Sequence, residues 1–254
     1  MRLEGMISIK AAILSKRYAV EQVWIDVKKR DHDTAFLLKR CQERNIRVQR
    51  LEREEMDTMA SGRTYGGLLA DVKNRVYQSL EECFPHDLMP FLVLLEGVED
   101  PFNLGYVMRA LYCAGCTGLI LPVRNWTRAE GTILKSSAGA GAYMNVVCMD
   151  PLTAVEECKK KGLYVYAAMR KKAIAYTQGN YTRPILLCIG GEMRGLSAGV
   201  LEKVDQHIDI PYAREFHNAL NAAAAGAVLG FEVNRQRHMD RLEQTNAAVG
   251  AEIV

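Results

Sequence analysis

One stretch of the sequence reads Phe91-Leu92-Val93-Leu94-Leu95, an unbroken apolar run. Strands that are buried on both faces of a parallel sheet have this composition. Similar short apolar runs follow at residues 118–122, 163–168, 185–189 and 207–210. Between the runs lie segments with helical patterns, at residues 104–114, 152–161 and 219–237. This alternation predicts an α/β fold with a mostly parallel sheet flanked by helices.

The residues before this region predict a second, smaller α/β unit. Helical patterns occur at residues 9–14 and 33–45, and strand patterns occur at 20–27, 46–51 and 66–72. The strand at 46–51 alternates polar and apolar residues, so we expect one of its faces to be exposed to solvent. Residues 76–90 hold a cluster of Glu, Pro, His and Asp that is typical of a linker. We therefore expect a small domain at 1–76, a linker at 77–90 and a larger domain at 91–254.

The positive charge of the chain is concentrated in its first third. The whole chain of 254 residues has a net charge of +3. Residues 1–80 hold 16 Lys and Arg against 11 Asp and Glu, whereas the remainder has an excess of two negative charges. A positive excess attracts a polyanion such as nucleic acid. An excess of this size is also compatible with an ordinary solvated surface.

Composition bounds the class of protein. Hydrophobic residues make up 49% and charged residues 25% of the chain, which is ordinary for a globular protein. No apolar stretch approaches the roughly 20 residues that span a bilayer, and residues 1–10 lack the apolar core of a secretory signal. We therefore expect a cytoplasmic protein without membrane contact. Its seven cysteines are expected to be reduced.

The cysteines do not form a metal-binding pattern. Cys113 and Cys116 make a single C-x-x-C pair, and the sequence contains no second pair at a suitable spacing. We therefore expect no metal site. Simple helix packing and a redox role remain as interpretations of this pair.

Three segments combine polar residues with glycines at predicted strand ends, where open parallel sheets bind their ligands. The first segment, residues 96–105, leads into a predicted helix and contains Asn103, with Arg109 six residues later. These two side chains can face one side only if Asn103 lies at or before the start of the helix. An Asn in that place is commonly an N-cap, and Arg109 could instead form a surface ion pair.

The second and third segments follow the runs at 185–189 and 207–210. Gly190 and Gly191 precede Glu192, and glycines after a buried strand allow a ligand to approach the backbone closely. Glu192 can accept hydrogen bonds from ribose hydroxyls or orient an Asn side chain. The third segment contains Leu220-Asn221 at the opening of an alanine-rich helix. A helix-capping turn in the second segment and dense helix packing in the third are the structural alternatives.

Several other chemistries lack their sequence signatures. The stretch Gly139-Ala140-Gly141-Ala142-Tyr143-Met144 begins like a dinucleotide-binding loop, but no buried strand leads directly into it. The chain has no P-loop, no cluster of histidines and carboxylates with metal-ligand spacing, and no Ser-His-Asp arrangement. A dehydrogenase is therefore a distant alternative.

The three segments together resemble the three motifs of the SpoU/TrmH branch of the SPOUT methyltransferases. A further stretch, Lys135-Ser136-Ser137-Ala138-Gly139-Ala140, looks like the basic-x-Ser-Ala-Gly-Ala pattern of that family. The resemblance covers roughly residues 91–238. Residues 7–75 more loosely resemble the substrate-binding domain that precedes the catalytic domain in many of these enzymes, with a closing stretch at 65–72.

The resemblance implies a knotted α/β fold, a homodimer and S-adenosylmethionine as cofactor. The expected reaction is methylation of a ribose 2′-hydroxyl in structured RNA, with ribosomal RNA preferred over transfer RNA. The catalytic end of the site is then expected to contain Asn103, Arg109, Glu192 and Asn221. The residues expected to hold the cofactor are Ala168, Gly190, Ile210 and Leu220. Arginine is a very poor base, so we assign Arg109 mainly to clamping the RNA phosphate and ribose.

Two departures from the family pattern leave alternatives open. Ala219 stands where the family usually has Ser, and the loop from Pro211 to Leu220 is one residue longer than usual. Asn218 or His217 could replace the missing hydroxyl. Otherwise the chain is a weakly active or inactive RNA-binding relative that acts in ribosome assembly. A base methyltransferase on the same fold is the second alternative.

Overall fold

The apolar run at residues 91–95 is a buried strand, β5 (Phe91–Glu96), in the computed structural model, which describes residues 1–15, 17–62 and 64–251. It lies in a seven-stranded sheet of order β7-β6-β5-β10-β8-β11-β9, in which every neighbouring pair is parallel. The predicted α/β fold is confirmed. The other strands of this sheet are β6 (Gly118–Leu121), β7 (Val146–Cys148), β8 (Tyr164–Ala168), β9 (Ile174–Ala175), β10 (Ile185–Gly190) and β11 (Gln206–Asp209).

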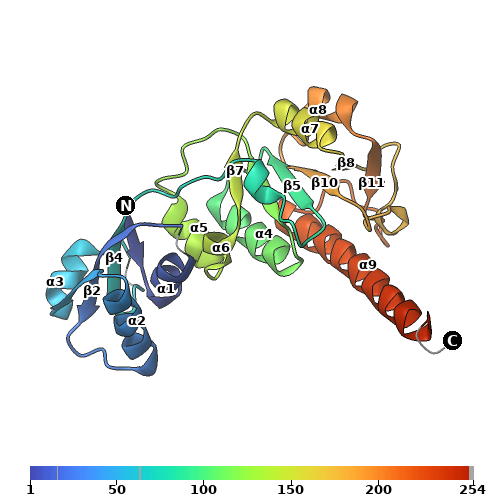
Figure 1. Cartoon of the computed structure of the whole chain (residues 1–254). Coiled ribbons are helices and arrows are strands. Elements are labelled where there is room, and N and C mark those ends of the chain that lie inside the picture. Colours follow the sequence, from blue (N-terminus) through green and yellow to red (C-terminus); the bar gives the residue numbers. More distant parts are fainter. Residues whose placement is uncertain (16, 63, 252–254) are drawn as a thin grey trace. The chain divides into compact units, whose positions relative to one another are not determined.

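Helices cover both faces of this sheet. Leu92 and Leu94 of β5 belong to a buried cluster with Val155 of α7 and Val200 of α8. Side chains alternate along a strand, and the opposite face is covered by α4 and α9, where Gly226 lies beside Ile189. Figure 1 shows α7 and α8 on one side of the sheet and α4 and α9 on the other. The helices are α4 (Pro101–Cys113), α7 (Pro151–Lys160), α8 (Ala198–Lys203) and α9 (Ala222–Ala251).

The chain forms two compact units that are not simply successive along the sequence. Residues 77–124 and 144–254 form the unit with the large sheet, whereas residues 1–76 and 125–143 form the other. The segment 125–143, which lies within the range expected for the larger domain, therefore packs with the N-terminal residues. The chain passes from one unit to the other at 76/77, 124/125 and 143/144.

The N-terminal unit contains a four-stranded sheet of order β1-β4-β2-β3. Strands β2 and β3 are parallel and the other pairs are antiparallel. Four of the five residues of β3 are exposed, so the expectation of a single exposed face was wrong. The elements are β1 (Arg2–Glu4), α1 (Met6–Ser15), β2 (Val20–Asp26), α2 (His32–Glu43), β3 (Arg47–Leu51), α3 (Arg53–Met59), β4 (Leu68–Val72), α5 (Glu130–Ser136) and α6 (Ala140–Tyr143).

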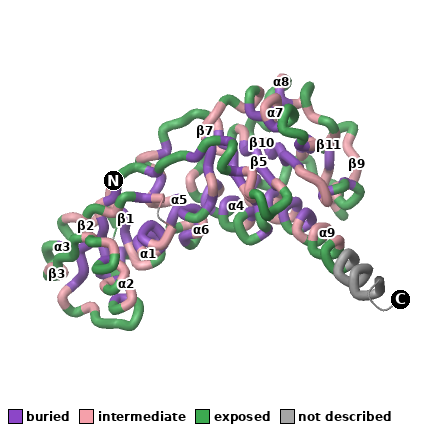
Figure 2. The backbone as a smooth tube through the Cα atoms, viewed as in Figure 1, coloured by how far each residue is buried: buried purple, intermediate pink, exposed green. Residues whose placement is uncertain are grey.

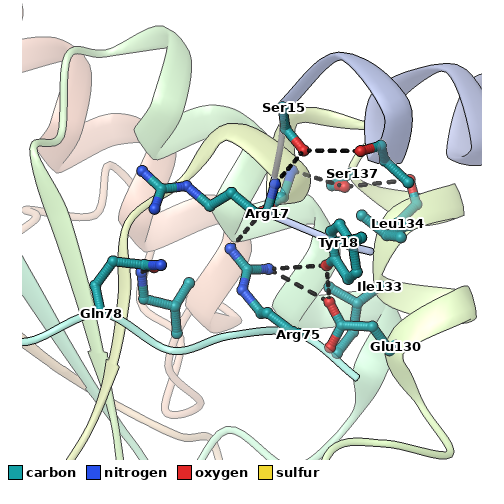
Figure 3. A network of polar contacts seen from close by, with 12 residues as sticks. Ser15, Arg17, Tyr18, Arg75, Gln78, Glu130, Ile133, Leu134 and Ser137 are labelled. Atoms are coloured by element: carbon teal, nitrogen blue, oxygen red, sulfur yellow. Dashed lines mark hydrogen bonds and ion pairs between the residues drawn. The ribbon is translucent and has the colours of Figure 1, made fainter. Parts of the chain in front are cut away.

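A buried ion pair attaches segment 125–143 to the first 76 residues (Figure 3). The Arg75 and Glu130 side chains are only 3% and 5% exposed, and Arg75 Nη1 lies 3.3 Å from Glu130 Oε1. The Tyr18 hydroxyl donates to the same carboxylate, and Arg75 Nη2 donates to the Gly141 carbonyl at 2.8 Å. Removing one partner from such a pair leaves a buried charge without compensation. The pair therefore fixes α5 and α6 within this unit.

The glycines of the 139–144 stretch are also explained by this attachment. A Cβ atom on Gly139, which has a φ of +85°, would lie 2.8 Å from the Cβ of Ala11 in α1. Ser137 is fully buried and accepts a hydrogen bond from the Gly141 backbone at 3.0 Å. The Gly139 site thus requires a residue without a side chain because helix α1 packs directly on it.

The segment expected to be a linker packs on the larger unit. It contains a short 3₁₀ helix, η1 (Glu81–Cys83), and Leu80 and Cys83 are buried, as are most residues of the neighbouring strands β5 and β10 (Figure 2). The Gln78 backbone N–H donates to the Val146 carbonyl at 2.9 Å, and the Gln78 side chain accepts from the Val146 N–H at 3.1 Å. Gln78 therefore extends the hydrogen bonding of β7.

Candidate functional site

A cavity of about 380 Å³ opens at the carboxyl ends of β8, β10 and β11. Strand β10 lies between β5 and β8, and the strands β5, β6 and β7 extend in the other direction, so the chain order reverses beside the cavity. Open α/β sheets bind ligands at such reversal points. We call this space the main cavity. It brings together four residues that the sequence assigned to the cofactor: Ala168, Gly190, Ile210 and Leu220.

The lining of the main cavity combines apolar walls with a few charged groups. Ile189, Ile208 and Ile210 supply aliphatic surface. The charged and polar residues of the lining are Arg170, Lys171, Glu192, Asp209 and Tyr212. Apolar walls with a small number of polar groups are typical of sites for small organic ligands.

Gly190 and Gly191 are required by backbone crowding. A Cβ on Gly190 would lie 2.4 Å from the carbonyl carbon of Gly195, and a Cβ on Gly191 would lie 2.0 Å from the Gly97 oxygen. The Gly191 N–H donates to the Glu96 carbonyl at 2.6 Å. The loops after β5 and β10 therefore cross in direct backbone contact, which no residue with a side chain would permit.

A second cavity of about 300 Å³ adjoins the first, because Gly191 and Glu192 line both. Asn103 also lines it, and its amide Nδ2 donates to Glu192 Oε1 at 3.2 Å. Asn103 is not the N-cap of α4: that residue is Asp100, whose carboxylate accepts from the Asn103 N–H at 2.8 Å. The interpretation of Asn103 as an N-cap was therefore wrong, and its side chain is free to join Glu192.

Arg109 lies apart from both cavities of its own chain. It is exposed and belongs to the lining of neither cavity. Asn103 lies within α4, so six residues of helix place the two side chains about 120° apart around its axis. Within the described ranges Arg109 makes no ion pair, so the surface ion-pair interpretation was wrong.

Asn221 caps the last helix. Its side-chain oxygen accepts from the Ala224 N–H at 2.7 Å, directly before the first residue of α9. Asn221 is exposed. Its neighbours Ala219 and Leu220 line the main cavity, but Asn221 is not among the described residues of that lining. The structure thus brings six of the eight predicted site residues to the two cavities and leaves Arg109 and Asn221 outside them.

The sequence did not reveal how the loop at residues 211–221 is held. Arg170 donates to the Phe216 and His217 carbonyls at 2.8 and 2.9 Å, and its guanidinium lies 4.2 Å from the centre of the Tyr212 ring. The Tyr212 hydroxyl accepts from the Leu220 N–H at 2.8 Å. Arg170 follows β8 by two residues, and this position at a strand end was the available signal.

Ala219 lines the main cavity at the place where the family usually has Ser. His217 and Asn218 are both exposed, and neither is among the described residues of the lining. The structure therefore gives no support to either residue as a substitute for the missing hydroxyl. The hydroxyl present in the lining is that of Tyr212.

In the part of the chain that the structure describes, no group of three or more His, Cys, Asp or Glu residues is arranged to bind a metal. All seven cysteines are free. Cys116 is buried and donates to the Gly118 carbonyl at 3.2 Å, whereas Cys113 is exposed.

Among the helices of the described residues, none combines the length and the apolar character that crossing a membrane requires.

Comparison with known protein families identifies the part of the chain that contains the two cavities. The sequence pattern of the SpoU rRNA methylase family matches residues 90–231, which contain both. The chain belongs to the SpoU rRNA methylase family. The resemblance stated from the motifs is thereby confirmed, and the chain is an RNA methyltransferase by family. Residues 2–78 match a second pattern, described as RNA 2′-O ribose methyltransferase substrate binding.

Relatives of this SpoU family member match it over most of the length of both chains. A putative TrmH family tRNA/rRNA methyltransferase of Staphylococcus haemolyticus is 29% identical over 239 residues, covering 92% of this chain and 95% of the relative. The putative TrmH family methyltransferase YacO of Bacillus subtilis is 30% identical and covers 78% and 81%. The solved SpoU methyltransferase AviRb of Streptomyces viridochromogenes, in complex with AdoMet, has a TM-score of 0.78 at 20% identity, covering 94% and 91%. That likeness confirms the fold.

Proposed function

We propose that this SpoU family member transfers a methyl group from S-adenosylmethionine to a ribose 2′-hydroxyl of structured RNA, with ribosomal RNA preferred over transfer RNA. One observation carries the proposal: a cofactor-sized cavity and a second cavity, whose lining includes Asn103 and several charged residues, share Gly191 and Glu192. The first can hold a methyl donor while the second holds the acceptor. The match of residues 2–78 to a 2′-O ribose methyltransferase substrate-binding pattern supports ribose as the acceptor.

The main cavity fits the proposed cofactor. Its volume of about 380 Å³ lies within the usual range for small-molecule sites. Ile210 and Leu220 would supply apolar surface for an adenine ring, the small side chain of Ala168 would leave room beside it, and Gly190 would contribute its backbone. The carboxylates of Glu192 and Asp209 in the lining favour a positively charged sulfonium. When bound, S-adenosylmethionine supplies a methyl group on a cationic leaving group.

Asn103 and Glu192 are the residues that we assign to the acceptor. Because the Asn103 amide nitrogen donates to Glu192 Oε1 at 3.2 Å, the amide holds this carboxylate in place, and Glu192 Oε2 is left to accept a hydrogen bond from the ribose hydroxyl. Glu192 would take up the proton of the ribose hydroxyl when the 2′-oxygen accepts the methyl group that a bound S-adenosylmethionine would supply. Alignment of the two reactants supplies most of the rate acceleration.

Arg109 points to a homodimer in this proposal. Phe102, Tyr106 and Arg109 are exposed and spaced by four and three residues, so they form one stripe on α4. Phe102 and Tyr106 are 54% and 51% exposed, which is high for aromatic side chains. We assign this stripe to the contact between two copies. Arg109 would then clamp RNA held by the second copy.

Two further predictions concern the connection of the chain and the location of the protein. The backbone contact between the loops after β5 and β10 supports the knotted connection that the family resemblance implies. RNA as the substrate supports a cytoplasmic location. Both features remain predictions.

The decisive experiment is transfer of labelled methyl from S-adenosylmethionine to unmodified total RNA, followed by nucleoside analysis. We expect a labelled 2′-O-methyl nucleoside. A labelled base would contradict the ribose assignment and favour a base methyltransferase.

Arg109→Ala is expected to lower methyl transfer by on the order of 100-fold while calorimetry shows unchanged cofactor binding. An equal loss of methyl transfer and of cofactor binding would contradict the role of Arg109.

The second candidate is a weakly active or inactive RNA-binding relative in ribosome assembly. It is favoured by one observation, Ala219 in the wall of the main cavity. Absence of methyl transfer with cofactor binding retained would support it. Ala219→Ser separates the candidates further, because restored transfer would show that only the hydroxyl was missing.

A further inference from the structure

A cleft of about 490 Å³ in the N-terminal unit has no role in the function proposed above. It is formed by three stretches that are distant in sequence: the start of β1, the loop at residues 61–62, and α5 with the turn before it. We call it the α5 cleft. Its lining contains Arg2, Glu4, Ser61, Gly62, Thr127, Arg128, Gly131, Thr132 and Lys135, together with the first residue of the chain.

The one carboxylate of the lining is neutralised. The Glu4 side chain is 9% exposed and lies 3.1 Å from Lys135 Nζ. The Ser61 and Gly62 N–H groups donate to it at 2.6 and 3.3 Å. Burial alone would raise the pKa of Glu4, but these hydrogen bonds outweigh burial and lower the pKa, so the group is ionised. Its negative charge is therefore directed at Lys135 and the loop, not at a ligand.

Arg2 is also compensated. Its guanidinium donates to both carboxylate oxygens of Asp71 at 2.9 and 3.0 Å, and to the Met59 carbonyl at 3.1 Å. Arg128 is different, because it is exposed and makes no hydrogen bond or ion pair among the described residues. Among the described side chains of the α5 cleft, Arg128 is therefore the cation without a partner, and the hydroxyls of Thr127 and Thr132 accompany it.

We propose that the α5 cleft binds a phosphodiester group of the substrate RNA through Arg128. The fork of N–H donors in a guanidinium matches two phosphate oxygens, and the threonine hydroxyls can donate to the same phosphate or to a ribose. The proposal rests on the proposed function for its ligand. It adds a contact that requires α5 as well as the first 76 residues.

This assignment also explains the Lys135–Ala140 stretch. Lys135 neutralises Glu4, Ser137 and Gly139 dock α6 on α1, and the Arg75–Glu130 pair fixes the start of α5 (Figure 3). All these contacts lie within the N-terminal unit. The stretch therefore builds the α5 cleft and does not contribute to the main cavity.

The test measures binding of the full chain to unmodified, transcribed ribosomal RNA across a range of salt concentrations. One phosphate contact contributes a slope of about 0.9 to the dependence of log affinity on log salt. We expect Arg128→Ala to reduce the slope by about 0.9, which is roughly an eightfold loss of affinity at 0.1 M salt relative to 1 M. Arg128→Lys is expected to retain the slope because it retains the charge.

Lys39→Ala is the matched control. Lys39 is exposed on α2 of the same unit, has no partner among the described residues and lies outside the α5 cleft. We expect it to leave the slope unchanged, and Thr132→Val to weaken binding without changing the slope. A slope for Arg128→Ala equal to that of Lys39→Ala would overturn the proposal.

Methyl transfer by the unaltered chain separates the two proposals. Transfer with an unchanged slope for Arg128→Ala would remove only the α5 cleft from the function. Absence of any RNA binding by the unaltered chain would overturn both.

Discussion

Arg170 has a role that depends on the fold. It reaches across from the end of β8 to two carbonyls of the loop at 211–221 and stacks on Tyr212. Hydrogen bonds from a charged donor contribute about 1.5–3 kcal/mol when they are shielded, and less when exposed. Because the loop forms one wall of the main cavity, we infer that Arg170 positions that wall.

Arg170→Ala is expected to weaken S-adenosylmethionine binding about tenfold, which corresponds to roughly 1.4 kcal/mol. The loss reflects a loop that must be ordered when the ligand binds. Isothermal titration calorimetry measures this change. Arg214→Ala in the same loop is the control, because Arg214 is exposed and makes no hydrogen bond or ion pair among the described residues. Equal affinities of the two variants would show that Arg170 does not hold the loop.

At the residue scale, the sequence predicted which residues lie at strand ends better than it predicted which side chains contact one another. The strand-end rule brought Asn103 and Glu192 together correctly, since the ends of neighbouring parallel strands meet at one edge. Arg170 and Tyr212 could not be assigned a role, because the carbonyls that Arg170 contacts lie 46 and 47 residues later in the chain. Asn221 was assigned to catalysis, but its side chain caps a helix.

At the scale of elements, the packing of α4 on α9 depends on two glycines one helical turn apart. A Cβ on Gly226 would lie 2.6 Å from Val107 Cγ2, and one on Gly230 would lie 3.2 Å from both Leu111 Cδ2 and the Ala114 Cβ. These glycines bring the two helices close together where they cover the sheet. The alanine-rich pattern predicted tight packing, and the structure places α4 as the partner.

Gly226→Ala is expected to lower the free energy of unfolding by about 1–3 kcal/mol, because Val107 must move from a packed position. The clash must first exceed the gain of about 0.5–1 kcal/mol that Ala brings to a helix. Chemical denaturation followed by circular dichroism provides the value. Gly199→Ala is the control of opposite sign, since its Cβ would meet only Leu152 at 3.6 Å. Stabilisation by Gly226→Ala would rule out the close contact.

The N-cap of α7 gives a pH dependence. Asp150 accepts hydrogen bonds from the Thr153 backbone and hydroxyl, both at 2.9 Å, and the backbone hydrogen bond is the largest cause that lowers the pKa of Asp150. A carboxylate with a lowered pKa in the folded state stabilises the fold above its unfolded pKa of about 3.9. That contribution is lost as the pH falls through the folded value.

Asp150→Asn keeps an acceptor oxygen but does not titrate. We expect its melting temperature to lie below that of the unaltered chain at pH 7, and the gap to narrow as the pH falls below about 4. Calorimetric scans at a series of pH values measure the gap. Asp87→Asn is the control, because Asp87 is exposed and makes no hydrogen bond within the described ranges. A gap independent of pH for Asp150→Asn would exclude this linkage.

The sequence predicted five strands of the large sheet and missed β7 and β9. The apolar run that became β5 is unambiguous because it is buried on both faces. Strands β7 and β9 have three and two residues, too few to show a period. The attachment of 125–143 to the N-terminal unit could not be predicted, because it depends on the pairing of Arg75 with a residue 55 positions away.

At the scale of the whole molecule, the proposed homodimer can be tested through the stripe on α4. We expect Phe102→Asp with Tyr106→Asp to produce monomers, because buried carboxylates without partners oppose association. Sedimentation velocity distinguishes the two states. Leu88→Asp is the control, since Leu88 is 59% exposed and lies outside α4. A doubly substituted chain that remained dimeric would place the contact elsewhere.

The threefold passage of the chain between its units has an evolutionary consequence. Recombination at residue 76 would exchange the N-terminal segment for that of a relative but leave 125–143 behind. Glu130 would then lose its ion pair with Arg75, and Lys135 would lose its ion pair with Glu4. The N-terminal unit therefore cannot be exchanged by transferring residues 1–76 alone. New substrate preferences are expected to arise by paired changes on both sides of this junction, so hybrid genes should preserve both pieces together.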